Sequence, residues 1–235
     1  MSDKKKEEGT LIEHLEELRG VLIRCLAAMA IVFLPMFFIT PYIMDKLIAL
    51  IMGDIGAPLN FFSPMEVFML QIKIAAVFDI LLCFPYMAKQ IWDFVLPALY
   101  DNERRFIRSI VLASSGLFII GVLFCLLFIL PLVIRFGMSF MTDNVKPVLG
   151  IGNVVSLALW LSVVFGITFQ FPLVTFALIR SGIVKYETVK NKRRFVFTGI
   201  LILSGILTPP DIISQLMLTL PTYALFEIGL FCGKK

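Results

Sequence analysis

The sequence is poor in charged residues, and this scarcity decides its broad class. Only 16% of the 235 residues are Asp, Glu, Lys or Arg, whereas 59% are hydrophobic and the mean hydropathy is +0.95. A water-soluble fold needs about a quarter of its residues charged to cover its surface. The composition therefore excludes a secreted scaffold and a disordered tail, and it predicts a protein embedded in the lipid bilayer.

Histidine and paired cysteines are also scarce. His14 is the only histidine, and the four cysteines lie in apolar runs without CxxC or Cys/His spacing. We therefore expect no metal site, no disulfide framework and no serine/histidine hydrolase in the membrane. No glycine-rich phosphate loop is present, so no nucleotide or other cofactor is expected. The remaining enzyme class is a membrane protease with an aspartate dyad, here Asp79 and Asp211. However, Asp211 follows two prolines and is better explained as a helix cap.

Long apolar runs predict an all-α polytopic membrane protein with six transmembrane helices in a single domain over residues 1–235. Leu11, Leu15 and Leu18 repeat at helical spacing, so residues 1–20 are expected to form an amphipathic segment on the membrane surface. The predicted spans are residues 21–39, 64–87, 106–130, 154–179, 195–207 and 212–231.

Capping residues and prolines set the predicted boundaries. Ser63, Pro64 and Glu66 combine an N-cap, a first-turn proline and a capping-box acid, so a helix should begin there. Prolines and glycines predict a loop over residues 40–62, and Pro131 predicts the end of the third span. The last two spans are short. Residues 195–207 cover only about 20 Å, so we expect the bilayer to thin around them, although a re-entrant hairpin would meet the same constraint.

Basic residues predict the orientation. Six crossings put both termini on one side, where 17 of the 21 Lys and Arg residues then lie. The opposite loops hold only Lys46, Arg135 and Lys146. This excess predicts that both termini are cytoplasmic, and it explains the basic clusters without any nucleic-acid partner.

Polar residues inside the predicted spans are candidate functional groups, because hydrocarbon cannot satisfy them. Lys73 and Asp79 flank the middle of the second span on different faces, and Glu66 shares the face of Lys73. Gln170 lies near Pro172, whose missing N–H frees a carbonyl at the same depth. Contacts with neighbouring helices, water or a simple proline kink would also explain these residues.

Several stretches of the chain are similar to one known family. They are LIEHLEELR at 11–19, FVLPALYDNERR at 94–105, LTPPDIISQ at 207–215 and LFEIG at 225–229. In this order around the predicted spans they resemble TatC, the multi-span subunit of the twin-arginine (Sec-independent) protein translocase. The resemblance covers nearly the whole chain. It implies that the protein is a core receptor and assembly platform in the cytoplasmic (inner) membrane. It also implies that the protein is not an enzyme.

The resemblance implies that signal peptides with two consecutive arginines bind at the cytoplasmic face, with Glu17 and Glu103 as the matching acids. A carboxylate meets the guanidinium group with two parallel hydrogen bonds, which lysine cannot reproduce. The surrounding site residues are expected to be Arg19, His14, Leu15, Phe94 and Arg105. Without the resemblance, Glu103 would be explained by the helix dipole and Glu17 by a solvated helix face.

The resemblance further implies TatA/TatB-type single-span partners, self-association in the complex, and export of folded precursors driven by the transmembrane gradient. The expected partner contacts are Thr208, Gln215, Gln170 and Asp211. The family usually has a glutamate at the position of Gln170, so a mechanism that needs a titratable carboxylate there is doubtful for this chain.

A small-solute secondary transporter is the alternative function. It would line a midplane substrate site with Lys73, Asp79 and Gln170, whereas a signal-peptide receptor needs acids at the cytoplasmic rim. The spatial arrangement of these three residues therefore discriminates between the two functions.

Overall fold

The computed structural model describes residues 2–52, 59–60, 62–95, 104–139, 149–180, 182, 184–207 and 212–234. Within these ranges the description excludes the side chains of residues 2–14, 52, 59, 104–107, 149, 213 and 214. The α-helices are α1 (Ser2–Met52), α2 (Pro64–Val95), α3 (Arg104–Phe124), α4 (Leu130–Met138), α5 (Ile151–Thr168), α6 (Phe171–Arg180), α7 (Tyr186–Asn191), α8 (Arg193–Leu207) and α9 (Ile212–Gly233). A π-helical turn, Cys125–Ile129, joins α3 to α4. Strand β1 (Leu59–Asn60) pairs in parallel with β2 (Leu149–Gly150).

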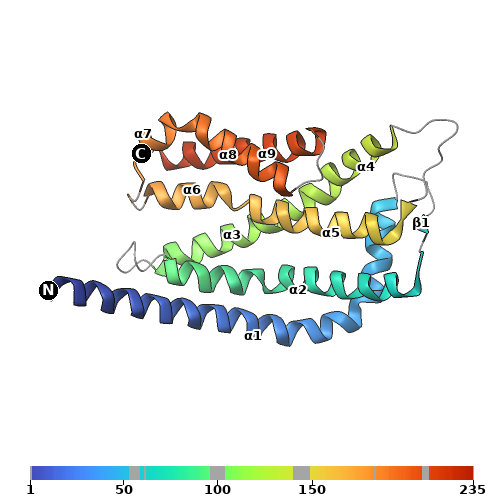
Figure 1. Ribbon diagram of the computed structural model, residues 1–235, viewed down its shortest axis with the longest axis horizontal. Helices are drawn as coiled ribbons and strands as arrows, with labels where there is room; N and C mark the ends of the chain where they lie inside the picture. The colour runs from blue at the N-terminus through green and yellow to red at the C-terminus, as the bar shows by residue number, and fades with distance from the viewer. Residues whose placement is uncertain are drawn as a thin grey trace.

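The long helices run roughly along one axis, and different elements lie at the two ends of the bundle (Figure 1). Both chain termini lie at one end, together with α7, the end of α2 and the start of α3. We call this the terminal end. The opposite end carries β1 and the start of α5, and we call it the strand end. An even number of membrane crossings requires the termini to share one end, while the side of the membrane on which they lie stays a prediction.

The described helices include five segments that are long and apolar enough to cross a membrane. They are Leu15–Ile51, Pro64–Val95, Arg108–Met138, Ile151–Arg180 and Gln215–Gly233. Large apolar side chains cover the outside, as in Ile31, which is 74% exposed, and Phe195, which is 76% exposed. A surface of this kind is stable only in contact with lipid or other apolar partners. The chain is therefore an all-helical membrane protein apart from the short β1–β2 pair, and the sixth crossing stays a prediction.

The first helix differs most from the expectation. The loop predicted over residues 40–62 is wrong for its first part, because α1 continues through Pro35 and Pro41 to Met52. A proline within a helix often bends it without ending it. Figure 1 shows that the last part of α1 turns away from the direction of its first part. Its N-terminal segment is part of this same helix rather than a separate element before it.

The second helix begins where the capping residues predicted. Ser63 Oγ accepts a hydrogen bond from the backbone N–H of Met65 at 3.3 Å. Glu66 Oε2 accepts one from the backbone N–H of Phe62 at 2.8 Å. These two bonds satisfy the N–H of Met65 in the first turn of α2 and the N–H of Phe62, two residues before the helix, which would otherwise be unpaired. The helix ends at Val95, beyond the predicted residue 87.

The third and fourth spans each contain an irregularity. Pro131 does not end the third span, because it lies in the first turn of α4 directly after the π-helical turn, which takes up the distortion. The fourth span is interrupted near Pro172, where the sequence indicates a proline kink. The turn at Phe169 and Gln170 separates α5 from α6, and the Gln170 N–H bonds to the Ile167 carbonyl at 2.9 Å.

The last two helices form an antiparallel hairpin that is shorter than the other spans. The helix α8 has 15 residues and is therefore about 22 Å long, less than a hydrocarbon core of about 30 Å. In Figure 1 the α8–α9 hairpin stops short of the strand end. This length agrees with the predicted shortness of residues 195–207.

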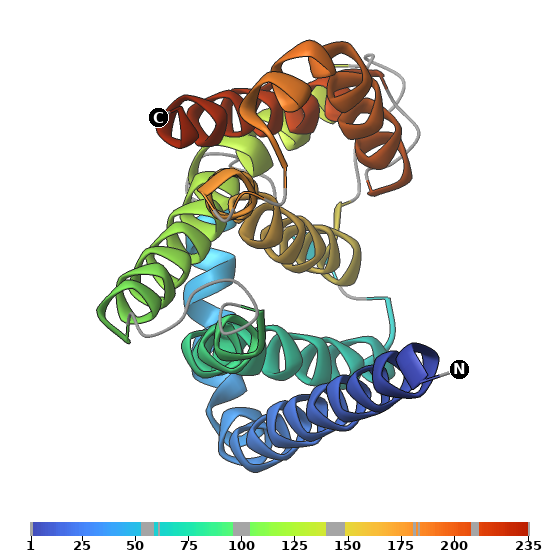
Figure 2. The same ribbon diagram turned by 90° about the vertical axis from the view of Figure 1, so that its left-hand side faces the viewer.

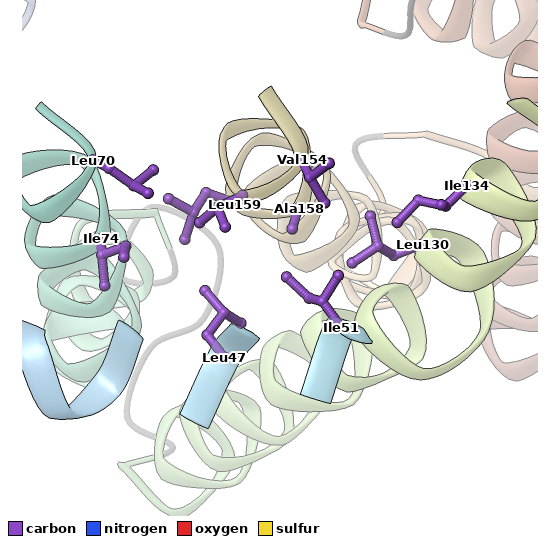
Figure 3. Close-up of a cluster of buried hydrophobic side chains, with 10 residues drawn as sticks. Leu47, Ile51, Leu70, Ile74, Leu130, Ile134, Val154, Ala158 and Leu159 are labelled. Carbon is purple, nitrogen blue, oxygen red and sulfur yellow. The ribbon is translucent and has the colours of Figure 1, made fainter. Parts of the chain in front are cut away.

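The main apolar core lies toward the strand end, where the bent part of α1 enters the bundle (Figure 3). Leu47 and Ile51 of α1 are 6% and 4% exposed. They pack among buried side chains from three other helices, namely Leu70, Ile74, Leu130, Ile134, Val154, Val155, Ala158 and Leu159. Within a membrane, packing of this kind stabilises through close van der Waals contact between the helices rather than by removing the side chains from water. The bent end of α1 therefore ties α2, α4 and α5 together and fixes the orientation of their polar faces.

Candidate functional site

The N-terminal part of α1 carries the first group of predicted binding residues. Leu15, Glu17 and Arg19 are all exposed, and Leu15 is 64% exposed. Residues two positions apart in a helix point about 200° apart, so Glu17 does not share a face with either neighbour. His14 belongs to α1, but its side chain is outside the description. Glu17 is thus accessible to a ligand that approaches the first part of α1.

The second group of predicted binding residues is described only in part. Phe94 is half-buried in the last turn of α2. Arg105 lies in the first turn of α3 and its side chain is not described, while Glu103 lies outside the described residues. Figure 2 views the molecule from the terminal end and shows the start of α1 standing away from the end of α2 and the start of α3. A ligand that touches both groups has to extend across this separation.

The α8–α9 hairpin holds one described partner-contact residue. Gln215 Nε2 donates a hydrogen bond to the Leu201 carbonyl of α8 at 2.9 Å. Gly205 packs directly against this amide, since a Cβ there would lie 2.9 Å from Gln215 Nε2. Among the described residues, none donates to Gln215 Oε1. Thr208 and Asp211, the other two candidates on this hairpin, lie outside the described residues.

Gln170 is bound within the chain and does not lie on the α8–α9 hairpin. Ser114 Oγ of α3 donates to Gln170 Oε1 at 2.6 Å, and Gln170 Nε2 donates to the Ser114 carbonyl at 3.1 Å. Ser114 is 2% exposed. The amide therefore links α3 to the α5–α6 turn inside the apolar region, which is the helix-to-helix contact that the sequence left open.

A polar cavity of about 300 Å³ lies between α2 and α5. Glu66 Oε1 accepts a hydrogen bond from the Gly152 N–H at 2.9 Å, so this carboxylate also caps the start of α5. Lys73 Nζ donates to Ser156 Oγ at 3.0 Å. Glu66, Lys73 and Ser156 line the same cavity, which confirms that Glu66 and Lys73 share one helix face.

The three residues of the transporter alternative do not meet in one site. Asp79 is 2% exposed and its Oδ1 accepts a hydrogen bond from Cys83 Sγ at 3.4 Å on the same helix. Lys73 contacts α5 and Gln170 contacts α3. A midplane substrate site requires such groups to converge. Across the described part of the chain, no group of three or more His, Cys, Asp or Glu side chains could hold a metal ion.

The structure adds contacts that the sequence did not predict. Arg193 Nη2 and Glu227 Oε2 form an ion pair at 2.8 Å, and the Tyr223 hydroxyl donates to Glu227 Oε1 at 2.7 Å. Trp160 of α5 donates from Nε1 to the Leu207 carbonyl at the end of α8, at 2.8 Å. Nothing in the sequence around Glu227 or Trp160 indicates which residue each of them contacts. These contacts fasten the α8–α9 hairpin to itself and to α5.

Comparison with known proteins gives one consistent result. The family model described as Sec-independent protein translocase protein (TatC) matches residues 13–221. The chain is 32% identical to the Sec-independent protein translocase protein TatC of Azotobacter chroococcum mcd 1, over 97% of this chain and 91% of that protein. It is 33% identical to TatC of Escherichia coli (strain K12), over 95% of this chain and 88% of that protein.

A solved structure has the same fold. It is the crystal structure of the twin arginine translocase receptor TatC in DDM, with a TM-score of 0.86 and 31% sequence identity. The match covers 94% of this chain and all of the other. The long kinked first helix, the interrupted fourth span and the short final hairpin therefore belong to an architecture already known from experiment.

Proposed function

Because this chain belongs to the TatC family of Sec-independent protein translocase proteins, we propose that it is the receptor of its translocase for twin-arginine signal peptides. The terminal end faces the cytoplasm of a bacterial cell and the protein resides in the cytoplasmic membrane. Glu17 and Glu103 bind the two arginines there. TatA/TatB-type single-span proteins associate along the α8–α9 hairpin, and the transmembrane gradient drives export of folded precursors.

The exposure of Glu17 at the start of a long helix is the observation that carries the receptor proposal. A carboxylate exposed at the surface can meet a guanidinium fork with two charge-assisted hydrogen bonds. The end of α2 and the start of α3 lie at the same end of the molecule as the start of α1 (Figure 1). An extended peptide with consecutive arginines has the reach to contact both, whereas a compact ligand does not.

The α8–α9 hairpin supports the proposed partner contact in two ways. Gln215 Oε1 accepts no hydrogen bond from the described residues, so it is open to a donor from another helix. The shortness of α8 also favours a partner with a short span, because two short helices side by side share the cost of bilayer thinning.

Photo-crosslinking of purified protein to a signal peptide tests the receptor proposal. Wild-type protein is compared with Glu17→Ala and Glu103→Ala, using one peptide with Arg-Arg and one with Lys-Lys. We expect the Arg-Arg peptide to bind about tenfold more tightly, and each variant to lose most of that preference. Glu16→Ala is the matched control, since Glu16 is also exposed on α1 but faces another direction. Equal binding of both peptides by all proteins would refute the assignment.

A further inference from the structure

Lys73 is a cation within a helix that is long and apolar enough to cross a membrane. It lies nine residues after the start of α2 at Pro64, which corresponds to about 13.5 Å along the helix. Its ammonium group donates to Ser156 Oγ, and no described acidic side chain pairs with it. An ammonium group carries three donors, and leaving them unmet in a membrane span costs several kcal/mol. The Lys73 side chain is exposed, so an acceptor from outside the chain can reach its ammonium group.

The cavity beside Lys73 contains groups of both signs. Glu66, Asn153 and Ser156 line it together with Lys73. Glu66 lies about 10.5 Å nearer to the start of α2 than Lys73, because seven residues separate them. The cavity thus extends from the membrane surface inward, with a carboxylate at its outer part and an ammonium group at its inner part.

The Glu66 carboxylate is held rigidly in this cavity. Its two oxygens accept hydrogen bonds from the backbone N–H groups of Phe62 and Gly152. Gly152 has no side chain, and a Cβ there would collide with Glu66 Oε1. Each carboxylate oxygen retains a second lone pair that can accept a bond from a ligand. The carboxylate is therefore a fixed acceptor that cannot swing across to neutralise Lys73.

We propose that this cavity binds the headgroup of a phospholipid with a primary amine, such as phosphatidylethanolamine. The phosphate accepts hydrogen bonds from Lys73 and the neighbouring polar side chains, and the amine donates to Glu66. In a bilayer the amine of such a lipid lies outside its phosphate, which is the order of the two charges in the cavity. A volume of about 300 Å³ admits such a headgroup, and Met69, 50% exposed, lines the cavity beside it for apolar contact.

A carboxylate from another protein fits this cavity less well. It would compensate Lys73, but it would leave Glu66 facing a second anion without any added cation. A zwitterion compensates both groups at once. An anionic lipid such as phosphatidylglycerol provides the phosphate but no amine for Glu66, so we expect it to bind more weakly than the ethanolamine lipid.

Native mass spectrometry of the delipidated full-length protein tests the proposal. The protein is titrated with phosphatidylethanolamine, phosphatidylcholine and phosphatidylglycerol of identical acyl chains. We expect the ethanolamine lipid to be retained severalfold more than either of the others. We also expect Lys73→Gln to lower its retention about tenfold, and Lys73→Arg to keep most of it. Lys46→Gln is the matched control, because Lys46 is exposed and lies over the Tyr42 ring outside this cavity.

Several outcomes would overturn the proposal. They are equal retention of the choline and ethanolamine lipids, stronger retention of phosphatidylglycerol, or equal effects of Lys73→Gln and Lys46→Gln. A loss of co-purified single-span partner in Lys73→Gln with unchanged lipid retention would assign the cavity to a protein instead. If Lys73→Gln does not fold, Ser156→Ala repeats the test by removing one hydroxyl of α5 from the cavity. We expect this variant to retain severalfold less ethanolamine lipid, and unchanged retention would contradict the proposal. Soluble phosphoethanolamine carries the same headgroup without acyl chains, and an excess of it should not displace the bound lipid. If it displaced the lipid at equimolar concentration, the natural ligand of the cavity would be a soluble compound rather than a lipid.

Discussion

Gln170 and Ser114 hold each other through two hydrogen bonds that run in opposite directions. The Ser114 hydroxyl donates to the Gln170 amide oxygen, while the Gln170 amide nitrogen donates to the Ser114 carbonyl. The same nitrogen lies 3.4 Å from the Gly166 carbonyl. An ionised glutamate at this position could accept from the hydroxyl but could not donate to either carbonyl. In this chain the position is a structural link between α3 and the α5–α6 turn.

Ser114→Ala should therefore destabilise the protein. The substitution leaves Gln170 Oε1 without its donor in an apolar region, which costs about 1–2 kcal/mol of unfolding free energy. Ser115→Ala is the control, because the Ser115 hydroxyl bonds only to the Val111 carbonyl of its own helix. Equilibrium unfolding in detergent measures both variants. Equal losses in the two variants would contradict a linking role for the Ser114 hydroxyl.

Gly229 lies where α9 touches α6, and Gly229→Ala should separate these helices. An added Cβ would lie 2.5 Å from the Pro172 carbonyl oxygen and 2.6 Å from its Cα, both of them backbone atoms that cannot rotate away. Overpacking of this kind costs about 1–3 kcal/mol. Gly199→Ala in α8 meets nothing within 4 Å and should be neutral or slightly stabilising, because alanine favours helix. A thermal unfolding midpoint unchanged in Gly229→Ala would refute this contact.

The sequence predicted those features that local chemistry decides. Ser63 and Glu66 act at the start of α2 through their own hydrogen bonds to nearby backbone groups, so their spacing was sufficient. The interruption at Gln170 was predictable because Pro172 removes a backbone donor. Charge scarcity and apolar runs indicated a helical membrane protein. The family followed from short motifs in the right order, and the comparisons agree with it.

The sequence could not predict features that depend on packing. Whether Pro41 ends or bends α1 depends on how the residues after it pack. Leu47 and Ile51 are buried in the core, and their contacts with other helices stabilise the continued helix. The partners of Lys73 and Gln170 are serines of other helices. Serine is common in apolar spans and has no pattern that reveals its partner. The ion pair of Glu227 with Arg193 arises only because the hairpin folds back on itself.

Glu227→Gln should loosen the terminal end of the α8–α9 hairpin. The variant leaves Arg193 without its ionic partner, and Arg193 Nε is already buried without a hydrogen-bond partner. Because the two side chains are 42% and 30% exposed, screening limits the expected loss to about 1 kcal/mol. Unfolding at low and high salt measures it, and the difference from wild type should narrow at high salt. Glu187→Gln, at an exposed acid of α7, should show little change.

Gln215→Leu, compared with Gln215→Glu, tests the use of this amide as an acceptor for a partner helix. The variant removes both the bond to the Leu201 carbonyl and the side-chain oxygen Oε1, so a partner helix loses its acceptor. Interhelical hydrogen bonds in membranes contribute about 0.6 kcal/mol on average, so co-purification of a single-span partner should fall about threefold. Leu216→Ala alters the adjacent position, 41% exposed, without touching a hydrogen bond. Gln215→Glu keeps an acceptor at this position and should retain more partner than Gln215→Leu. If all three variants retain as much partner as the wild type, neither the polar group of Gln215 nor the apolar side chain beside it contributes to binding. The contact surface for the partner would then lie elsewhere on the molecule.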